Sequence, residues 1–506
     1  MSPLNRRRFL KSSAAAAALA SVPIRSLAQT SAAPATLTIH TGQSGPTIPA
    51  NYIGLSYEIE QLSDPSFFSR ENTGFIEQFR ALSPNGVLRL GGNTSDVGWW
   101  KSTPSSPRPP LPSNVVLQTP KDERSPMDLA YAVTPEAIHN LRAFLDATGW
   151  TCLYGINLGS STPARAAEEA EFVHKILGPK LEYFQVGNEP DGFDRRFRDK
   201  ATWNADAYFN DWLASANAIR ARVASARFGM PDVAGNVGWF PTLADRLLAL
   251  KDRPNIAALT HHYYFTGPPS NPRANFNALL QPDPRVTRDA ALAHDAAQKL
   301  GTLYRMTEGN TCYRGGKPGF SDAFGAALWA ADYALLLASL GYAGVNLHGG
   351  SAKQVANSLG GRMPGDEFIA NPSEVHPRPF YTPIADIPSP SGQAKYIAEP
   401  DNFGLRFAGR FAGGTVLPLT FSPMNGSSAV NATAYAARLP SGQIIVAIIN
   451  KDAQPLPIDL PGYSVGRIMT APSLDARSVE DREPNGNRAA STVPPLTAML
   501  LYSSRA

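Results

Sequence analysis

Two glutamates stand out, because each follows a run of apolar residues and each has a side chain suited to acid–base or nucleophilic chemistry. Glu189 comes directly after the segment QVGN at positions 185–188, and Glu308 comes after the segment LYRMT at positions 303–307. Hydrolysis of a glycosidic bond needs two carboxyl groups that flank the bond. One protonates the leaving oxygen, and the other attacks the anomeric carbon or activates a water molecule. The pair therefore predicts glycoside hydrolysis, provided that the fold brings the two residues together.

The chain from residue 51 to about residue 350 repeats one simple unit, in which a short apolar run ends in polar residues and an amphipathic stretch follows. The apolar runs span residues 52–57, 86–90, 151–157, 181–186, 233–235, 257–263, 303–307 and 343–347. Helices are expected at residues 134–148, 163–177, 205–223, 241–250, 288–299 and 321–340. The first of them has Thr134 as N-cap and Pro135 at its first position. Alternating strands and helices favour a parallel sheet, and eight units predict an α/β fold of the (β/α)8 TIM-barrel type.

The barrel gives the two glutamates their expected positions. Glu189 would follow the fourth strand and Glu308 the seventh, and catalytic groups of TIM barrels come from the C-terminal ends of strands. Two such side chains can converge across a small barrel mouth. A separation of about 5–5.5 Å between the carboxyl groups would mean retention through a covalent intermediate. A single glutamate after a strand is more commonly a charge at a helix N-terminus, so the prediction depends on the pair.

The remaining chain has a different pattern. Helical periodicity fades from about residue 400, and strands are expected at residues 415–421, 431–438, 444–450, 458–460, 466–471 and 498–502, which predicts an accessory all-β sandwich. Residues 37–40 have the pattern of a further strand that could pair into it. We therefore expect an N-terminal strand segment at 29–47, a catalytic barrel at 48–395 and a β-sandwich at 396–506. A long polar loop at 351–379 would lie over the barrel's C-terminal face.

Residues 1–28 have the pattern of an export signal. Three arginines at positions 6–8 precede Phe-Leu-Lys, an apolar run follows at 14–22, and Ser-Leu-Ala at 26–28 fits a cleavage site. The paired arginines predict export by the twin-arginine route to the periplasm or the medium, with an ordinary secretory signal as the alternative. Without these residues, 41 basic and 42 acidic residues remain, so the charge gives no argument for a nucleic-acid partner. No membrane partner is expected after removal of the signal.

Four short motifs resemble the β-glucuronidase and heparanase family, glycoside hydrolase family 79. They are LRLGGNTSD at 88–96, GNEPD at 187–191, HYY at 262–264 and LHGG at 347–350. The resemblance covers nearly the whole mature chain. It implies a barrel hydrolase with Glu189 as general acid/base and Glu308 as nucleophile. It also implies a sandwich built from the C-terminal region plus an N-terminal strand.

The resemblance further implies roles for residues that bind the substrate. Asn188 would hydrogen-bond the 2-hydroxyl of the sugar, a contact that can strengthen in the transition state. Tyr264 would donate a hydrogen bond to Glu308 and keep it ionised and oriented. Tyr313 and Tyr381 match positions at which tyrosines of family glucuronidases hold the carboxylate of the substrate.

Other polar and aromatic residues stand near the ends of predicted strands. Arg89 could support Glu308 from below the barrel mouth, and Glu58 could bind sugar hydroxyls. A buried ion pair inside the barrel would explain either residue equally well. Trp99 and Trp100 could stack on a sugar, although packing within a loop is the more common use of such residues.

No cofactor and no metal are expected. His261 and His262 are adjacent on a predicted strand, so their side chains would point to opposite faces of the sheet. With His348 they do not complete a recognisable set of metal ligands. Cys152 and Cys312 form no metal motif, and we expect both to pack in the core.

The sequence therefore predicts a retaining glycoside hydrolase that removes terminal β-linked glucuronic acid, or its 4-O-methyl ether, from glycans or glycosides. Its partner would be a carbohydrate that carries a uronic acid. One alternative is an endo-acting, heparanase-like enzyme on acidic polysaccharide, which would need an open cleft with basic subsites. The loop at 351–379 favours exo action, because it would close one end of the cleft. The alternative of another class is a non-catalytic sugar-binding protein on a barrel scaffold, and the presence of both glutamates argues against it.

Overall fold

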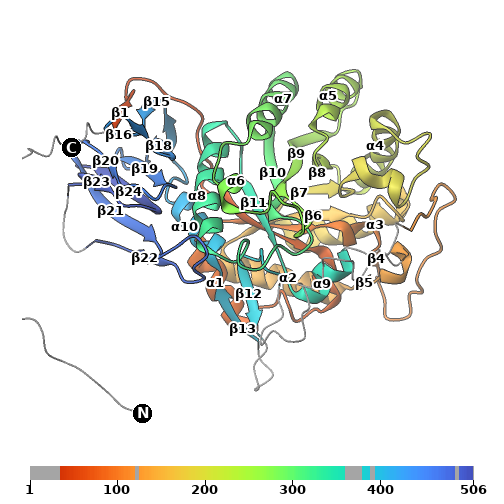
Figure 1. Ribbon diagram of the computed structural model, residues 1–506. Coiled ribbons are helices and arrows are strands. Elements are labelled where there is room, and N and C mark those ends of the chain that lie inside the picture. Colours follow the sequence, from red (N-terminus) through yellow and green to blue (C-terminus); the bar gives the residue numbers. More distant parts are fainter. Residues whose placement is uncertain (1–34, 120–124, 359–378, 388–393, 485–488, 505–506) are drawn as a thin grey trace, which may run out of the picture.

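A closed barrel of eight parallel strands forms the centre of the computed structural model, which describes residues 35–119, 125–358, 379–387, 394–484 and 489–504 (Figure 1). The strands follow one another around the barrel in chain order. They are β2 (Ile53–Glu58), β3 (Val87–Gly91), β6 (Thr151–Ile156), β7 (Leu181–Val186), β8 (Arg227–Val233), β9 (Asn255–Thr266), β10 (Leu303–Cys312) and β11 (Val345–Gly349). The predicted TIM barrel is confirmed.

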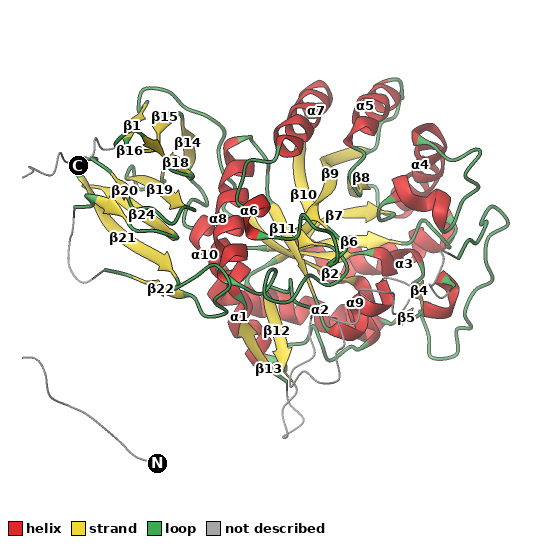
Figure 2. Ribbon diagram, in the orientation of Figure 1, coloured by secondary structure: helices red, strands yellow, loops and turns green. Residues whose placement is uncertain are grey.

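The helices lie around the strands and cover them from outside (Figure 2). They are α1 (Thr73–Leu82), α2 (Pro135–Thr148), α3 (Pro163–Leu177), α4 (Ala205–Arg222), α5 (Phe240–Leu248), α6 (Phe276–Leu279), α7 (Pro284–Leu300) and α8 (Phe324–Ser339). Every residue of β2, β3 and β11 is buried. Such continuous burial is typical of parallel strands with one face on the barrel interior and the other under helices. Helix α1 was not predicted, and α7 begins four residues before the predicted start.

The fifth strand is the one barrel element that the sequence reasoning misplaced. It was predicted at 233–235 and lies at Arg227–Val233, so the two overlap only at Val233. Gly229, Pro231 and Asp232 interrupt the β-forming pattern of this segment, and Pro231 has no N–H to donate to a neighbouring strand. The strand is nevertheless buried from Phe228 onward, because charged groups inside the barrel compensate the carboxylate of Asp232.

Helix α8 is buried between the barrel and the C-terminal sheets. It packs against α10 (Pro400–Gly409), a helix within the segment that was expected to hold only strands. A Cβ atom on Gly404 would lie 2.2 Å from the carbonyl oxygen of Ala327, so the two helices can approach this closely only because residue 404 is glycine. Helical residues therefore continue past residue 400 and join the barrel to the sheets that follow.

The C-terminal region forms a six-stranded antiparallel sheet in the order β14-β18-β19-β24-β21-β22. One face of β19 packs on the barrel side, with Ile445 and Ile449 in the main core. The other face, with Val446 and Ile448, packs in a separate apolar cluster. These strands and the smaller sheets comprise β14 (Thr415–Leu417), β15 (Leu419–Ser422), β16 (Met424–Asn425), β17 (Ser428–Ala429), β18 (Ala432–Arg438), β19 (Ile444–Asn450), β20 (Leu456–Pro457), β21 (Tyr463–Thr470), β22 (Glu480–Arg482), β23 (Thr492–Val493) and β24 (Thr497–Ser503).

Strand β1 (Thr36–Ile39) pairs antiparallel with β15, so a segment that precedes the barrel in the chain lies among the C-terminal strands (Figure 1). Leu37 and Ile39 pack against the second apolar cluster. The strand predicted at 458–460 lies two residues earlier, as β20, and Ile458 itself makes only an isolated bridge to Ala35. The predicted domain boundaries remain predictions.

The chain after β11 returns toward α1 through short elements. They are α9 (Ala352–Ser358), β12 (Ile384–Ile387) and β13 (Lys395–Ala398). Elsewhere in the chain, two short strands, β4 (Trp99–Trp100) and β5 (Ala132–Val133), lie between β3 and α2. Most of the predicted loop at 351–379 lies outside the described residues. Cys152 and Cys312 are buried free thiols. Among the residues that the structure describes, no helix combines the length and the apolar character needed to cross a membrane.

Candidate active site

Glu189 and Glu308 converge at the C-terminal end of the barrel, where both face Nδ1 of His262, at 3.0 Å from Glu189 Oε1 and 4.0 Å from Glu308 Oε2. One carboxylate oxygen of each glutamate and one ring nitrogen of His262 all lie within 4.8 Å of one another. Glu189 follows β7 as predicted. Glu308 lies within β10, which continues to Cys312, and an irregular register at Met306 and Glu308 interrupts the strand pairing there. An oxygen separation below 4.8 Å suits the close spacing of a retaining pair, because an inverting pair is about 6.5–9.5 Å apart to admit a water molecule.

Glu308 is buried and held by two donors. Arg89 Nη1 lies 2.6 Å from Oε2, and the Tyr264 hydroxyl donates to Oε1 at 2.8 Å. Burial alone would raise the pKa of Glu308, but the electrostatic influence of His348, His262 and Arg89, with the hydrogen bond from Tyr264, lowers it to about 2. Glu308 is therefore an anion across the physiological pH range. Arg89 and Tyr264 stand where the sequence analysis expected them to support this residue.

Asp232 is the group that the sequence analysis missed. It is the penultimate residue of β8, at a backbone φ of 63°, and its carboxylate is buried within the barrel. Oδ2 lies 2.5 Å from Arg89 Nη2, and Oδ1 accepts hydrogen bonds from Thr307 Oγ1 at 2.5 Å and Gln185 Nε2 at 2.6 Å. Burial would raise the pKa of Asp232, yet Arg89 and His262 hold it far below its usual range. The sequence analysis missed Asp232 because it placed the fifth strand at 233–235, so that Asp232 lay outside any predicted strand.

His262 connects Asp232 to Glu189. Its Nε2 lies 3.2 Å from Asp232 Oδ1, and its Nδ1 lies 3.0 Å from Glu189 Oε1. Burial would lower the pKa of His262, but Asp232 and Glu308 raise it to about 10. The ring is therefore an imidazolium at neutral pH and donates one hydrogen bond to each carboxylate. The positive charges of Arg89 and His262 then balance the negative charges of Asp232 and Glu308.

Glu189 differs from Glu308 in exposure and in backbone conformation. Its side chain is 24% exposed, whereas that of Glu308 is 8% exposed. Its backbone is left-handed, with φ 47° and ψ 51°, and its N–H donates to the carbonyl oxygen of Asp232 at 2.9 Å. A strained conformation of this kind persists only where surrounding contacts fix it. Glu189 therefore presents a partly exposed carboxyl group from a fixed position, as a group that exchanges protons with a substrate and water requires.

The backbone and the side chain of Asn188 are both hydrogen-bonded to buried polar groups. Its backbone N–H donates to Asp96 Oδ2 at 3.0 Å, and its side-chain oxygen accepts from Arg89 Nη2 at 2.6 Å. Asp96 also accepts from the backbone N–H groups of Leu158 and Gly159. Burial raises the pKa of Asp96 to about 6 despite these hydrogen bonds. Because the side-chain oxygen of Asn188 is occupied by Arg89, its amide nitrogen is the atom that could donate to a substrate hydroxyl.

Glu58 is part of the barrel interior. Its Oε2 accepts hydrogen bonds from the Thr94 backbone N–H at 3.0 Å and the Thr94 hydroxyl at 2.7 Å. Its Oε1 lies 3.5 Å from His348 Nε2, and His348 Nδ1 lies 3.7 Å from Glu308 Oε2. Glu58 and His348 thus extend the network behind Glu308. These contacts favour the buried-ion-pair explanation of Glu58 over direct contact with sugar.

Three tyrosines gather on the side of the site that β9, β10 and the segment after β11 form. The ring of Tyr264 lies 6.1 Å from that of Tyr313 and 6.3 Å from that of Tyr381. Tyr313 is 40% exposed, whereas Tyr381 is buried and its ring lies 5.7 Å from that of His348. Asn310 Nδ2 donates to the carbonyl oxygens of Tyr381 at 2.7 Å and of His348 at 3.0 Å, and so fixes both residues.

A group that could hold a metal ion is present after all, since Glu189, His262 and Glu308 could each offer one ligand atom. A metal ligand must be a neutral imidazole, and His262 is instead a cation with a hydrogen bond on each nitrogen. The nitrogen that faces both glutamates, Nδ1, is thus already used by the hydrogen bond to Glu189. His261 points to the outer face of the strand, where its Nε2 lies 2.8 Å from the Tyr342 hydroxyl.

Comparisons with known proteins find an export signal and two similar β-glucuronidases. Residues 3–23 match the family model of the twin-arginine translocation pathway signal sequence, which confirms the predicted export route. The chain is 26% identical over 311 residues to a β-glucuronidase of Aspergillus niger and 26% identical over 356 residues to one of Neurospora crassa. These matches cover 57% and 63% of this chain, and 55% and 61% of the two relatives. The chain thus spans less than two thirds of each relative's length.

Solved structures show the same fold at low sequence identity. A 4-O-α-L-rhamnosyl-β-D-glucuronidase from Fusarium oxysporum, in complex with Rha-GlcA, aligns with a TM-score of 0.62 and 15% identity, over 91% of this chain and 97% of that one. A family 51 arabinofuranosidase from Xanthomonas axonopodis pv. citri aligns with a TM-score of 0.63 and 15% identity, over 93% and 100%. This protein is therefore an exported relative of β-glucuronidases, built on the barrel-and-sandwich fold that several glycoside hydrolases share.

Proposed function

We propose that the protein is a retaining β-glucuronidase that removes terminal β-linked glucuronic acid, or its 4-O-methyl ether, from glycans or glycosides. The observation that carries the proposal is the pairing of Glu189 with Glu308, whose carboxylate oxygens lie within 4.8 Å of each other. One member is buried and anionic, and the other is partly exposed. The similarity to two β-glucuronidases supports glucuronic acid as the sugar.

In the first step, a carboxylate oxygen of Glu308 attacks C1 of the glucuronosyl residue. The bond between C1 and the leaving oxygen breaks, and Glu189 gives its proton to that oxygen. A glycosyl ester forms on Glu308. Arg89 and Tyr264 keep Glu308 ionised and fix its orientation, so the reacting oxygen is already placed before substrate binds.

In the second step, Glu189 acts as a base. It takes a proton from a water molecule, the resulting nucleophile attacks C1, and the ester bond to Glu308 breaks. Two displacements at C1 return the sugar with its original β configuration. His262 donates to Glu189 throughout, so the carboxylate that forms in the first step gains a charge-assisted hydrogen bond.

We assign recognition of the substrate carboxylate to Tyr313 and Tyr381, beside Tyr264. Tyrosine hydroxyls can donate hydrogen bonds to a carboxylate without adding a positive charge next to Glu308. An arginine at this place would compete for the catalytic carboxylates. The position of the three rings on one side of Glu308 supports this assignment.

A panel of 4-nitrophenyl β-glycosides tests the proposal. We expect kcat/KM for the glucuronide to exceed that for the glucoside and xyloside by about 100-fold or more, because a site built for a polar group rejects analogues that lack it. The galacturonide keeps the carboxylate and tests recognition of the configuration at C4. NMR of the first product should show the β anomer. Preference for an uncharged glycoside, or release of the α anomer, would contradict the proposal. Sugar binding without turnover would favour the non-catalytic alternative.

Digestion of an oligosaccharide that ends in glucuronic acid separates exo from endo action. We expect single glucuronic acid residues to appear from the chain end. Release of fragments from the middle of the chain would instead indicate the endo-acting, heparanase-like alternative.

A further inference from the structure

The short segment that carries Glu189 is anchored at both of its ends. At the first end, the backbone N–H of Asn188 donates to Asp96 Oδ2 at 3.0 Å. At the second end, the guanidinium of Arg198 donates to two carbonyl oxygens of the β6 loop (residues 157–160), which follows strand β6. Asp96 is 1% exposed and Arg198 is 6% exposed, so little water competes for either contact.

Asp96 and Arg198 meet on the same two peptide groups of the β6 loop. The backbone N–H groups of Leu158 and Gly159 donate to Asp96 Oδ1 at 3.0 and 2.9 Å. The carbonyl oxygens of the same two residues accept from Arg198 at 3.0 and 2.9 Å. A buried anion thus holds the N–H side of the loop, and a buried cation holds its carbonyl side. Hydrogen bonds to charged groups are the strong ones, so both ends of the segment are fixed against one common loop.

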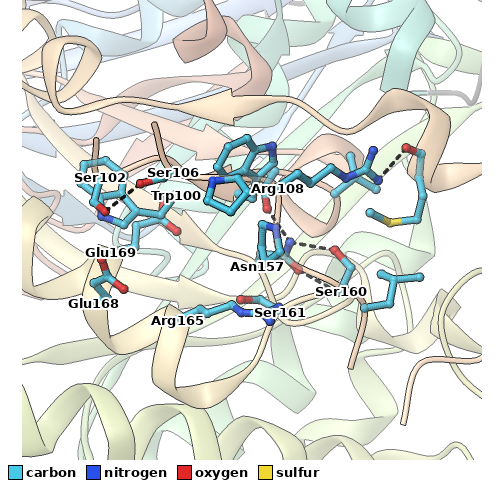
Figure 3. Close-up of a pocket in the computed structure, with 17 residues that line it drawn as sticks. Trp100, Ser102, Ser106, Arg108, Asn157, Ser160, Ser161, Arg165, Glu168 and Glu169 are labelled. Carbon is cyan, nitrogen blue, oxygen red and sulfur yellow. Dashed lines mark hydrogen bonds between the residues drawn. The ribbon is translucent and has the colours of Figure 1, made fainter. Parts of the chain in front are cut away.

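Side chains of the β6 loop keep its shape. Asn157 Nδ2 donates to Ser160 Oγ at 3.0 Å, and the Ser160 backbone N–H donates to Asn157 Oδ1 at 2.9 Å (Figure 3). The Ser160 hydroxyl donates in turn to the carbonyl oxygen of Asp96 at 2.7 Å. Both loop residues line a cavity of about 200 Å³, so on that side hydrogen bonds and not packing hold the loop. Asp96 therefore contacts a loop that has a fixed conformation.

The anchor at Asn188 acts on the residues that face the substrate. The side-chain oxygen of Asn188 accepts from Arg89, which leaves its amide nitrogen to donate to a sugar hydroxyl. The next residue, Glu189, has a left-handed backbone, and such a conformation persists only where neighbouring contacts impose it. Asp96 supplies one of these contacts, directly before the strained residue.

We propose that Asp96 is a positioning residue, whose carboxylate holds the backbone of Asn188 so that the amide of this side chain meets the 2-hydroxyl of the bound sugar. The inference rests on the proposed function and adds to it a residue that is too deeply buried to touch the substrate. It predicts that the enzyme loses its preference for a substrate with a 2-hydroxyl when Asp96 can no longer accept from all three backbone N–H groups.

The test compares 4-nitrophenyl β-glucuronide with its 2-deoxy analogue on the full-length enzyme. The measured quantity is the 2-hydroxyl ratio, which is kcat/KM for the first substrate divided by kcat/KM for the second. A lower fraction of folded enzyme reduces both rates equally. A residue with a merely structural role therefore leaves the 2-hydroxyl ratio unchanged.

Asp96→Asn is the first test variant. It keeps the size of the side chain but replaces one acceptor oxygen with an NH₂ group, which then faces a backbone N–H. We expect the 2-hydroxyl ratio to fall about tenfold. Asp452→Asn is the matched control, because Asp452 also accepts from two backbone N–H groups, those of Asn431 and Gln454, each at 3.1 Å, in the C-terminal region. The control should keep the wild-type ratio.

A double-variant cycle shows whether Asp96 acts through Asn188. Asn188→Ala removes the amide that would meet the 2-hydroxyl, so it should lower the ratio about tenfold by itself. Adding Asp96→Asn to Asn188→Ala should then lower the ratio by less than about twofold more, because the contact that Asp96 positions is already absent.

Gly159→Ala displaces Asp96 by a different route and decides the matter if Asp96→Asn does not fold. A Cβ atom on Gly159 would lie 2.7 Å from Cβ of Asp96, so the two residues cannot keep their present contact. We expect the 2-hydroxyl ratio to fall about threefold, from a weakened hydrogen bond. Gly42→Ala is its control, because a Cβ atom on Gly42 would have no other atom within 4 Å.

Three results overturn the inference. They are 2-hydroxyl ratios within about twofold of wild type in the Asp96 and Gly159 variants, an unchanged ratio in Asn188→Ala, and full additivity of the two losses in the double variant. Failure of the wild type to hydrolyse 4-nitrophenyl β-glucuronide would instead overturn the proposed function.

Discussion

The carboxylate of Asp232 and the guanidinium of Arg89 lie 2.5 Å apart, and each side chain is 1% exposed. Arg89 also contacts Glu308, and Asp232 also contacts His262. One buried ion pair therefore touches both the proposed nucleophile and the residue that donates to the proposed acid/base. The charge state of the whole site depends on it.

Replacement of Asp232 should lower the free energy of unfolding. Asp232→Asn leaves the charge of Arg89 partly uncompensated in the barrel interior, and breaking a buried pair costs about 3–5 kcal/mol. Urea denaturation measures the free energy of unfolding. Asp252→Asn is the matched control, because Asp252 pairs with Arg220 at 2.6 Å but its side chain is 85% exposed. We expect the control to change stability by less than about 1 kcal/mol. Equal losses in both variants would argue against a special role for the buried pair.

Loss of the Tyr264 hydroxyl should change the pH profile. Its hydrogen bond helps to lower the pKa of Glu308 to about 2, so Tyr264→Phe should raise that pKa by about one unit. A nucleophile must be ionised, and the acidic limb of kcat/KM against pH should therefore move toward higher pH. Tyr263→Phe provides the control, because the Tyr263 hydroxyl donates to Asp283, away from the site. An acidic limb that stays in place in Tyr264→Phe would refute this account of Glu308.

Removal of the acid/base should affect substrates according to their leaving groups. Glu189→Ala should lower kcat/KM on an alkyl glucuronide by about 10²–10⁴-fold, since such a leaving group needs a proton. Turnover of substrates with good leaving groups should persist, and azide should partly restore it by replacing the missing base in the second step. Steady-state kinetics with and without azide measure both effects. A uniform loss across leaving groups, with no response to azide, would contradict the role of Glu189.

Loss of the proton from His262 should lower the stability of the folded protein at alkaline pH. The folded protein raises the pKa of this imidazole from 6.5 to about 10, so the folded state holds a proton that the unfolded state releases. The resulting stabilisation is fully present below pH 6.5 and is lost as the pH rises toward 10. The melting temperature, measured between pH 6 and pH 10, should fall with a steeper slope in the wild type than in His262→Gln. Parallel slopes would show that His262 does not carry this dependence.

Local patterns in the sequence determined much of this protein. Short apolar runs, each followed by an amphipathic stretch, predicted seven of the eight barrel strands close to their observed bounds. A strand that is buried on both faces is made almost entirely of apolar residues, so the sequence shows it directly. The order of the strands then placed Glu189 and Glu308 at the same end of the barrel. The export signal is likewise a local pattern, and residues 3–23 of it match the twin-arginine signal model.

Only the tertiary structure decided the groups whose role depends on distant partners. Asp232 and Pro231 weaken the β pattern of their strand, and the carboxylate becomes favourable only beside Arg89, which lies 143 residues earlier in the chain. The imidazolium of His262 likewise requires charges from β8 and β10. Helix α10 forms where strands were expected because it packs on α8. A sequence pattern records what each segment can bury, whereas charge compensation inside a barrel depends on which segments meet.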